Sequence, residues 1–177
     1  MDCNISLGND DVINVAGIVR ESIVDGPGFR FVIFCQGCPH GCKACHNPDT
    51  HAFKDNKLMK VDELFESIMK PRMGKGVTFS GGEPFCQAAS FAKLGEKLKA
   101  AGIDILIFTG YEYEELIKLS EKNASIMKLI KMADYIIDGR YEEELRDLSL
   151  KFRGSSNQRI IDVKKTLETH KVVEAEL

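Results

Sequence analysis

The stretch Cys38-Pro39-His40-Gly41-Cys42-Lys43-Ala44-Cys45 carries three cysteines at the spacing C-x3-C-x2-C and follows the apolar run Phe31–Cys35. Three thiolates on one short loop can hold a four-iron cluster while one iron keeps no protein ligand, whereas protein Fe–S clusters normally take four cysteines. Catalytic zinc sites keep an open position in the same way. The loop therefore predicts one [4Fe–4S] cluster, ligated by Cys38, Cys42 and Cys45, with an iron reserved for another molecule.

A four-cysteine zinc site is the alternative interpretation, because Cys35 precedes Cys38 by three positions and completes the pattern C-x2-C-x3-C-x2-C. Paired C-x2-C motifs in zinc sites are usually separated by a longer spacer. Cys35 also continues an apolar run, so it is more simply the last residue of a buried strand. A zinc-binding module without catalysis nevertheless remains an alternative at this point.

Bulk properties indicate one ordinary globular domain. The chain has 177 residues and a net charge of −3, with no electrostatic reason to bind nucleic acid or an anionic membrane. We expect a single domain over residues 1–177, with a core at about 13–169 and flexible tails. The longest apolar runs are too short to span a membrane, and no basic-then-apolar leader opens the sequence, so we expect a cytoplasmic protein.

Strand-like and helix-like segments alternate along the chain. The predicted strands are Asn14–Val19, Phe29–Cys35, Val77–Phe79, Ile103–Phe108, Tyr135–Ile137 and Arg159–Ile161. The predicted helices are Val61–Lys70, Gln87–Ala100, Glu114–Leu119, Ser125–Lys131, Glu142–Leu148 and Val163–Thr169, the last with Asp162 as N-cap. This alternation predicts an α/β fold with a parallel sheet.

Polar or glycine-rich motifs follow the strands. Besides the cysteine loop they are Ser80–Pro84, Thr109–Tyr111 and Asp138–Arg140. Ligands bind at the carboxyl edge of parallel strands, so we expect these motifs to converge. Taken singly, each has a plainer interpretation: Ser80–Pro84 as a tight strand-to-helix connection, and Asp138–Arg140 as a surface turn with a solvated arginine.

The ordered motifs resemble those of radical S-adenosylmethionine (SAM) enzymes. The cysteine loop continues as His46-Asn47-Pro48, and Asp25–Arg30 and Gly81–Pro84 are similar to motifs of the glycyl-radical-enzyme activases. Thr109–Tyr111 and Arg153–Arg159 resemble the branch that activates anaerobic ribonucleoside-triphosphate reductase. The resemblance runs from about Ile13 to Ile161. It implies a partial (β/α) barrel of about five or six units in a single domain, open at one side.

The resemblance also implies roles for individual residues. SAM would chelate the fourth iron, and an electron from the reduced cluster would cleave it to methionine and a 5′-deoxyadenosyl radical. The residues expected to contact SAM are Ala44, Cys45, His46, Gly81, Gly82, Glu83, Thr109, Asp138 and Arg140. Glu83 would accept a hydrogen bond from the ammonium group. Ala44 replaces the aromatic residue found before the third cysteine in many radical SAM enzymes, so an adenine contact there would use backbone or a small apolar surface.

The implied partner is the large subunit of anaerobic ribonucleoside-triphosphate reductase, on which the activase would install a glycyl radical. Partner contacts are expected at Asp25, Gly26, Arg30, Asn157 and Arg159, although a polar surface loop is the plainer interpretation of Arg153–Arg159. A flavodoxin or ferredoxin would supply the electron. Alternatives are activation of another glycyl radical enzyme, such as pyruvate formate-lyase, and action on a free metabolite, as in carboxy-deazaguanine synthases.

Overall fold

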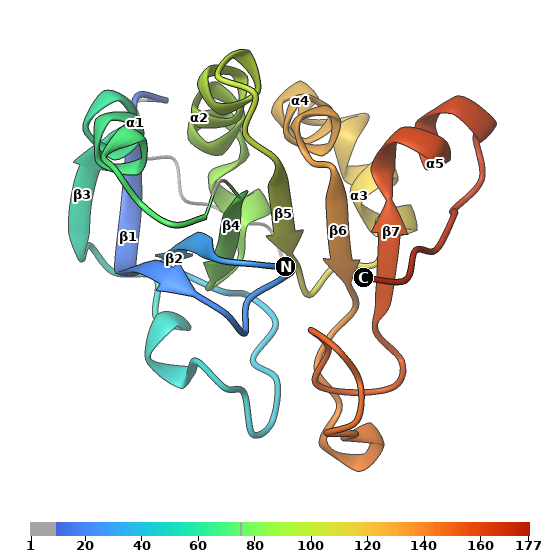
Figure 1. Cartoon of the computed structure of the whole chain (residues 1–177). Coiled ribbons are helices and arrows are strands. Elements are labelled where there is room, and N and C mark those ends of the chain that lie inside the picture. Colours follow the sequence, from blue (N-terminus) through green and yellow to red (C-terminus); the bar gives the residue numbers. More distant parts are fainter. Residues whose placement is uncertain (1–9, 75) are drawn as a thin grey trace.

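A computed structural model describes residues 10–74 and 76–177. Its centre is one seven-stranded sheet with the order β3-β1-β2-β4-β5-β6-β7 (Figure 1). The strands are β1 (Val12–Ser22), β2 (Arg30–Cys35), β3 (Lys57–Lys60), β4 (Gly76–Gly81), β5 (Ile105–Phe108), β6 (Tyr135–Asp138) and β7 (Arg159–Asp162). The prediction of a single-domain α/β partial barrel is confirmed.

The sheet is mixed, so the prediction of a parallel sheet was wrong for its outer strands. The neighbours β2, β4, β5 and β6 are parallel, whereas β1 pairs antiparallel with both β2 and β3, and β7 pairs antiparallel with β6. The reason lies in the connections. Residues 23–29 between β1 and β2 are too few for a crossover, and a hairpin reverses the chain there. Strand β3, with its two lysines, was missed.

The helices are α1 (Val61–Met69), α2 (Ala88–Ala100), α3 (Tyr113–Ser120), α4 (Ala124–Met132) and α5 (Val163–Thr169). Three short 3-10 turns are η1 (Pro48–Thr50), η2 (Pro84–Gln87) and η3 (Glu143–Leu145). The helix predicted at Glu142–Leu148 was therefore wrong. That segment instead folds against its own continuation through a bridge between Arg146 and Ser155, so its carbonyls and amides find partners across the loop.

The main core lies between the sheet and the helices, which gather on one side of it (Figure 1). In this core the rings of Phe79 and Phe91 lie 4.6 Å apart. Asp162 caps α5 as predicted, since its side chain accepts a hydrogen bond from Lys165 N at 3.0 Å. In the described part of the chain, no helix is long and apolar enough to cross a membrane.

A smaller apolar cluster covers the other face of the sheet. Leu106, Ile137 and Ile160 form it, and Phe152 and Leu177 pack against it. The C-terminal segment, expected to be a flexible tail, lies along β7: the amide of residue 175 donates to Ile160 O and the amide of residue 162 donates to the carbonyl of residue 173. The cysteine loop and residues 139–158 lie at the edge where the parallel strands end (Figure 1).

Candidate functional site

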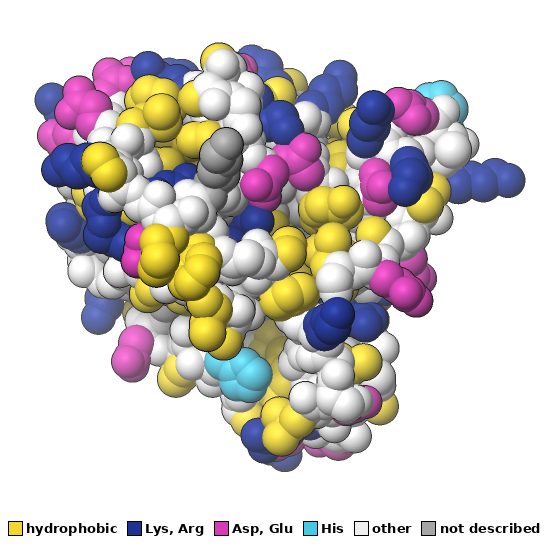
Figure 2. Space-filling view, viewed as in Figure 1, with side chains coloured by type: hydrophobic (Ala, Val, Ile, Leu, Met, Phe, Trp, Pro, Cys, Tyr) yellow, Lys and Arg dark blue, Asp and Glu magenta, His cyan; other side chains and the backbone are white. Residues whose placement is uncertain are grey.

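A cavity of about 410 Å³ opens at the carboxyl edge of the parallel strands. Its walls come from the β1–β2 connection, the cysteine loop, the ends of β4 and β5, and the segment 139–158. In Figure 2 a hollow lies between the lobe of the cysteine loop and the lobe of that segment. Cys38, Cys42 and Cys45 all line it. The motifs therefore converge as expected in one respect: these cysteines, Gly81, Gly82 and Thr109 line the same cavity.

The three cysteines suit a cluster of several irons. All three are free thiols, and burial is the main cause that raises the pKa of Cys38 to about 12 and the pKa of Cys42 above its usual value. Iron binding would replace the thiol protons, as metals do at thiolate sites. Within the described residues no three His, Cys, Asp or Glu side chains converge on one ion. Three free thiols that line one cavity supply the donors that an iron–sulfur cluster takes, so these residues would fit such a cluster.

Cys35 does not join the other three thiols. It ends β2, is fully buried in the main core and does not line the cavity. Burial raises the pKa of its thiol well above the usual value. The four-cysteine zinc site considered from the sequence is therefore not formed.

The side chain of Glu83 joins three loops through hydrogen bonds. Its carboxylate is fully buried and accepts hydrogen bonds from Thr109 Oγ1 at 2.9 and 3.0 Å and from Gly110 N at 2.9 Å. His40 Nε2, from inside the cysteine loop, lies 2.8 Å from the same carboxylate. Phe85 N donates to it at 3.0 Å. These partners already occupy the oxygens that were expected to receive the SAM ammonium group.

Glycines allow the same loops to touch. A Cβ added to Gly82 would lie 2.3 Å from Gly37 O, and one added to Gly110 would lie 2.4 Å from the ring of His40. Gly81 adopts φ +91°, a region that side chains disfavour. The two motif glycines thus bring the end of β4 against the start of the cysteine loop, as well as lining the cavity.

The buried Asp138 forms an ion pair outside the cavity with Arg159, which is only partly buried. Asp138 accepts from Arg159 Nε at 3.1 Å and from Tyr113 N at 2.8 Å, which joins β6, β7 and the start of α3. Its side chain and that of Glu114 raise the pKa of Arg159 above its usual value. Neither Asp138 nor Arg159 lines the cavity.

Arg140 and Asn157 lie beside each other but also outside the cavity. Arg140 is exposed and lies 3.3 Å from Glu115, and its carbonyl accepts from Asn157 Nδ2 at 2.8 Å. Ala44 has φ +55°, is exposed and does not line the cavity, whereas His46 does, with its ring 5.0 Å from that of Tyr141.

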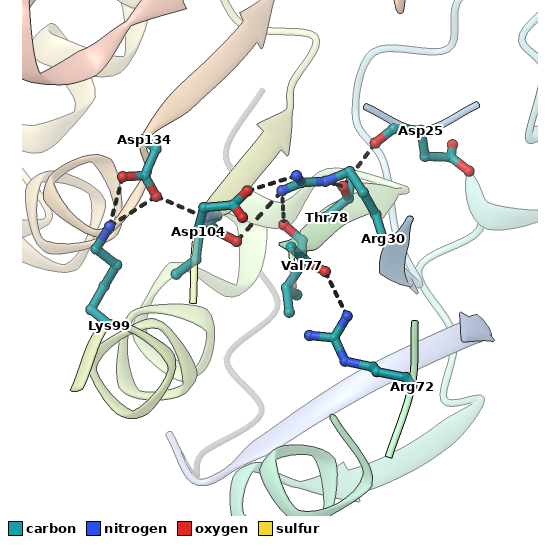
Figure 3. Close-up of polar contacts among 10 residues, drawn as sticks. Asp25, Arg30, Arg72, Val77, Thr78, Lys99, Asp104 and Asp134 are labelled. Carbon is teal, nitrogen blue, oxygen red and sulfur yellow. Dashed lines mark hydrogen bonds and ion pairs between the residues drawn. The ribbon is translucent and has the colours of Figure 1, made fainter. Parts of the chain in front are cut away.

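The β1–β2 motif divides between two environments. Asp25 lines the cavity and accepts from Ser22 Oγ at 2.5 Å. Gly26 and Arg30 are buried away from it, and Arg30 is only 2% exposed. Its guanidinium donates to Thr78 Oγ1 and to Asp104 Oδ2, each at 2.6 Å, and to Val77 O at 2.7 Å (Figure 3). Of the predicted partner contacts, Asp25 alone reaches the cavity.

Several cavity residues were not predicted. His51, Tyr141 and Arg153 line it, and His51 Nε2 and Arg153 Nε are buried without a hydrogen-bond partner. His51 and Tyr141 belong to no motif found in the sequence, so nothing selected them. Arg153 opens the Arg153–Arg159 motif, but within that motif only Asn157 and Arg159 were expected to make contacts.

The comparisons with known proteins agree with this geometry. A family model described as a 4Fe-4S single cluster domain matches residues 24–161. The anaerobic ribonucleoside-triphosphate reductase-activating protein of Escherichia coli (strain K12) is 34% identical over 145 residues, which cover 77% of this chain and 90% of that protein. The protein of the same name from Enterobacteria phage T4 is 35% identical over 155 residues, with coverages of 84% and 93%.

A relative with another partner is also similar. The pyruvate formate-lyase-activating enzyme of Clostridium pasteurianum is 43% identical over 113 residues, which cover 59% of this chain and 48% of that enzyme. The reductase-activating relatives are instead matched over nearly their whole length. Because the cluster-domain match spans most of the chain as well, this chain belongs to the radical SAM family of glycyl-radical-enzyme activating enzymes.

Proposed function

We propose that this chain binds SAM in the cavity and uses it to install a glycyl radical on the large subunit of an anaerobic ribonucleoside-triphosphate reductase. The observation that carries the proposal is the meeting of three free cysteines with the loops of β4 and β5 in one cavity. The extent of the match to reductase-activating proteins supports the choice of partner.

Cys38, Cys42 and Cys45 would hold the cluster. When bound, the cluster supplies the electron that breaks a carbon–sulfur bond of SAM, which gives methionine and a 5′-deoxyadenosyl radical. That radical would take one hydrogen atom from a glycine Cα of the partner and become 5′-deoxyadenosine, and the unpaired electron would remain on the glycine. No side chain needs to move a proton in this sequence.

The chain's own contribution is positioning and exclusion of water. Glu83 fixes the cysteine loop against the ends of β4 and β5, so the cluster ligands and the cavity floor keep one geometry. Backbone groups at Gly81 and Gly82 line the cavity and would contact the methionine half of SAM. Asp25, which lines the cavity from the β1–β2 connection, would contact the partner where its glycine enters.

Some residues that were expected to contact SAM or the partner lie outside the cavity, and we propose supporting roles for them. Asp138 and Arg159 hold the base of the segment 139–158, which forms one cavity wall. Arg140 and Ala44 are exposed and Asn157 is half-buried; all three lie outside the cavity and would meet the adenosyl half of SAM or the partner only at its rim. A flavodoxin or ferredoxin as electron donor, and the cytoplasm as the location, complete the proposal.

Anaerobic reconstitution with iron and sulfide tests it. The protein should cleave SAM under dithionite and, with a reductase large subunit, give a carbon-centred EPR doublet on that partner. Cys42→Ala should abolish both, whereas Cys35→Ala, at a core thiol, should retain the cluster if its fold is intact. SAM cleavage by Cys42→Ala would contradict the proposed cluster role.

Activation of pyruvate formate-lyase is the second candidate, because 113 residues are 43% identical to such an activating enzyme. The same EPR experiment with a pyruvate formate-lyase as partner separates the two. A doublet on that enzyme and none on the reductase would overturn the proposed partner while leaving the radical chemistry in place.

A further inference from the structure

His51 lines the cavity where the three cysteines meet, and its side chain has an unpaired polar atom. Its Nε2 is buried, and neither a thiol nor any other group in the described residues is a hydrogen-bond partner for it. A buried polar atom without a partner costs about 1–3 kcal/mol. Native proteins retain few such atoms, and a bound ion or other group is one physical reason for them. The partner of His51 Nε2 is therefore expected among the groups that the cavity binds.

The other two histidines that line the cavity already have partners in the protein. His40 Nε2 lies 2.8 Å from the carboxylate of Glu83, and the ring of His46 lies 5.0 Å from that of Tyr141. In the described part of the chain, neither has a buried nitrogen without a partner. His51 is thus the histidine of this cavity whose ring the protein leaves unsatisfied.

Backbone hydrogen bonds hold His51 beside the first of the three cysteines. Cys38 N donates to His51 O at 3.1 Å, and the residues just before them pair in the same way, since Gly37 N donates to Thr50 O at 2.8 Å. His51 N donates to Pro48 O at 3.2 Å and so closes the turn η1. His51 therefore cannot move away from Cys38 unless these bonds break.

The side chain of Gln36 holds the same segment on both sides of His51. It is fully buried, and its Nε2 donates to Ala52 O at 2.7 Å and to Asp49 O at 3.3 Å. Asn56 Nδ2 donates to its Oε1 at 3.0 Å. The protein itself thus fixes the backbone of His51, and a group that is positioned in advance loses little freedom when its partner binds.

An iron–sulfur cluster supplies the kind of acceptor that this position lacks. Its thiolate and sulfide sulfurs are anionic and accept hydrogen bonds, whereas a neutral imidazole with its proton on Nε2 is a donor. Cys38, which would bind one iron, is the residue whose backbone pairs with His51. Hydrogen bonds to the sulfurs are among the factors that set the reduction potential of such a cluster.

We propose that His51 donates a hydrogen bond from Nε2 to a sulfur of the cluster and thereby raises the cluster's reduction potential. The inference rests on the proposed function, because it assumes that Cys38, Cys42 and Cys45 hold a [4Fe–4S] cluster. Reduction adds one electron and no proton, so the sulfurs become more negative and the hydrogen bond becomes stronger. His51 therefore favours the reduced state, which is the state that would transfer an electron to SAM.

An EPR-monitored redox titration of the anaerobically reconstituted protein, without SAM or a partner protein, tests this role. His51→Leu should lower the equilibrium constant for one-electron reduction about tenfold, which corresponds to a midpoint potential about 59 mV more negative. His51→Gln keeps an N–H donor near the position of Nε2, so its equilibrium constant should stay within about twofold of wild type. His170→Asn is the control, since His170 is exposed at the end of α5 and does not line the cavity; it should leave the potential unchanged.

A second measurement detects the hydrogen bond itself and carries the test if His51→Leu loses iron. Pulsed EPR of the reduced cluster, in protein whose histidine rings are labelled with nitrogen-15, reports ring nitrogens that lie close to the cluster. The wild-type protein should show a ring-nitrogen coupling that His51→Gln lacks.

The outcomes separate the role of His51 from the proposed function. A potential that is unchanged or raised in His51→Leu, or ring couplings that all persist in His51→Gln, would overturn the role of His51 and leave the proposed function standing. A shift that appears only when the titration is repeated with SAM would also overturn it, because the partner of Nε2 would then be SAM. Failure of the wild-type protein to bind a four-iron cluster would overturn both.

Discussion

Replacement of Glu83 by alanine is the most informative single change for the architecture of the site. The buried carboxylate accepts hydrogen bonds from Thr109 Oγ1, Gly110 N, Phe85 N and His40 Nε2. These donors belong to three different loops. Glu83→Ala leaves all of them without their acceptor. Each buried, unsatisfied donor costs about 1–3 kcal/mol.

Some of these donors can reach water once the carboxylate is gone, so we expect a loss of about 3–5 kcal/mol in the free energy of unfolding, less than the full sum. That is a large fraction of the roughly 5–15 kcal/mol that stabilises a typical domain. The anchor of the cysteine loop at His40 is lost at the same time, so the protein should also retain less iron after reconstitution.

Urea unfolding of the metal-free protein measures the first effect, and iron content per chain after desalting measures the second. Glu66→Gln, on the exposed face of α1, is the control and should change neither value. A loss below about 1 kcal/mol for Glu83→Ala, with full iron retention, would refute the claim that Glu83 fastens the loops.

Three further predictions concern the scaffold. Gly82→Ala should greatly reduce iron retention, because its Cβ would lie 2.3 Å from the carbonyl oxygen of Gly37; iron content equal to wild type would contradict this. Arg30→Met should lower the unfolding free energy by about 3–5 kcal/mol, because Thr78 and Asp104 lose a buried partner. Asp104→Asn keeps an acceptor for Arg30 but leaves the buried guanidinium without its carboxylate partner, so it should cost about 1–3 kcal/mol, less than Arg30→Met, and urea unfolding would expose any reversal of this order. Hydrogen bonding to Lys165 lowers the pKa of Asp162, so its capping contribution is present above about pH 4 and is lost as the pH falls through the lowered folded-state pKa. The stability difference between wild type and Asp162→Ala should be about 1 kcal/mol near neutral pH and shrink in acid; a constant difference would refute the assignment.

Local patterns predicted the elements that carry strong periodicity. The buried strands and the helices of the main core were found because apolar spacing reports directly on burial. Strand direction was not found, because the alternation of strands and helices is the same whether an outer strand runs parallel or antiparallel. The helix predicted at Glu142–Leu148 failed because its charged residues suit a helix, whereas the contacts that hold the segment, such as Glu142 N to Ser155 Oγ, join residues 13 positions apart.

The site was predicted in part for the same reason. The cysteine spacing is a local property, so the three ligands were identified together and lie in one cavity. The roles of Glu83 and His40 depend on where three loops meet, and no local pattern reports that His40 lies against Glu83. Arg153 opens the Arg153–Arg159 motif, but no local pattern reports that its Nε is buried without a partner or that it lines the cavity.

Mössbauer spectroscopy of protein reconstituted with iron-57 tests the central claim most directly. Three cysteine ligands leave one iron of four chemically distinct, so the account predicts a three-to-one pattern in which the minor component alone shifts when SAM is added. The account would be contradicted if all four irons were equivalent, if SAM left their spectrum unchanged, and if Cys35→Ala lost the cluster.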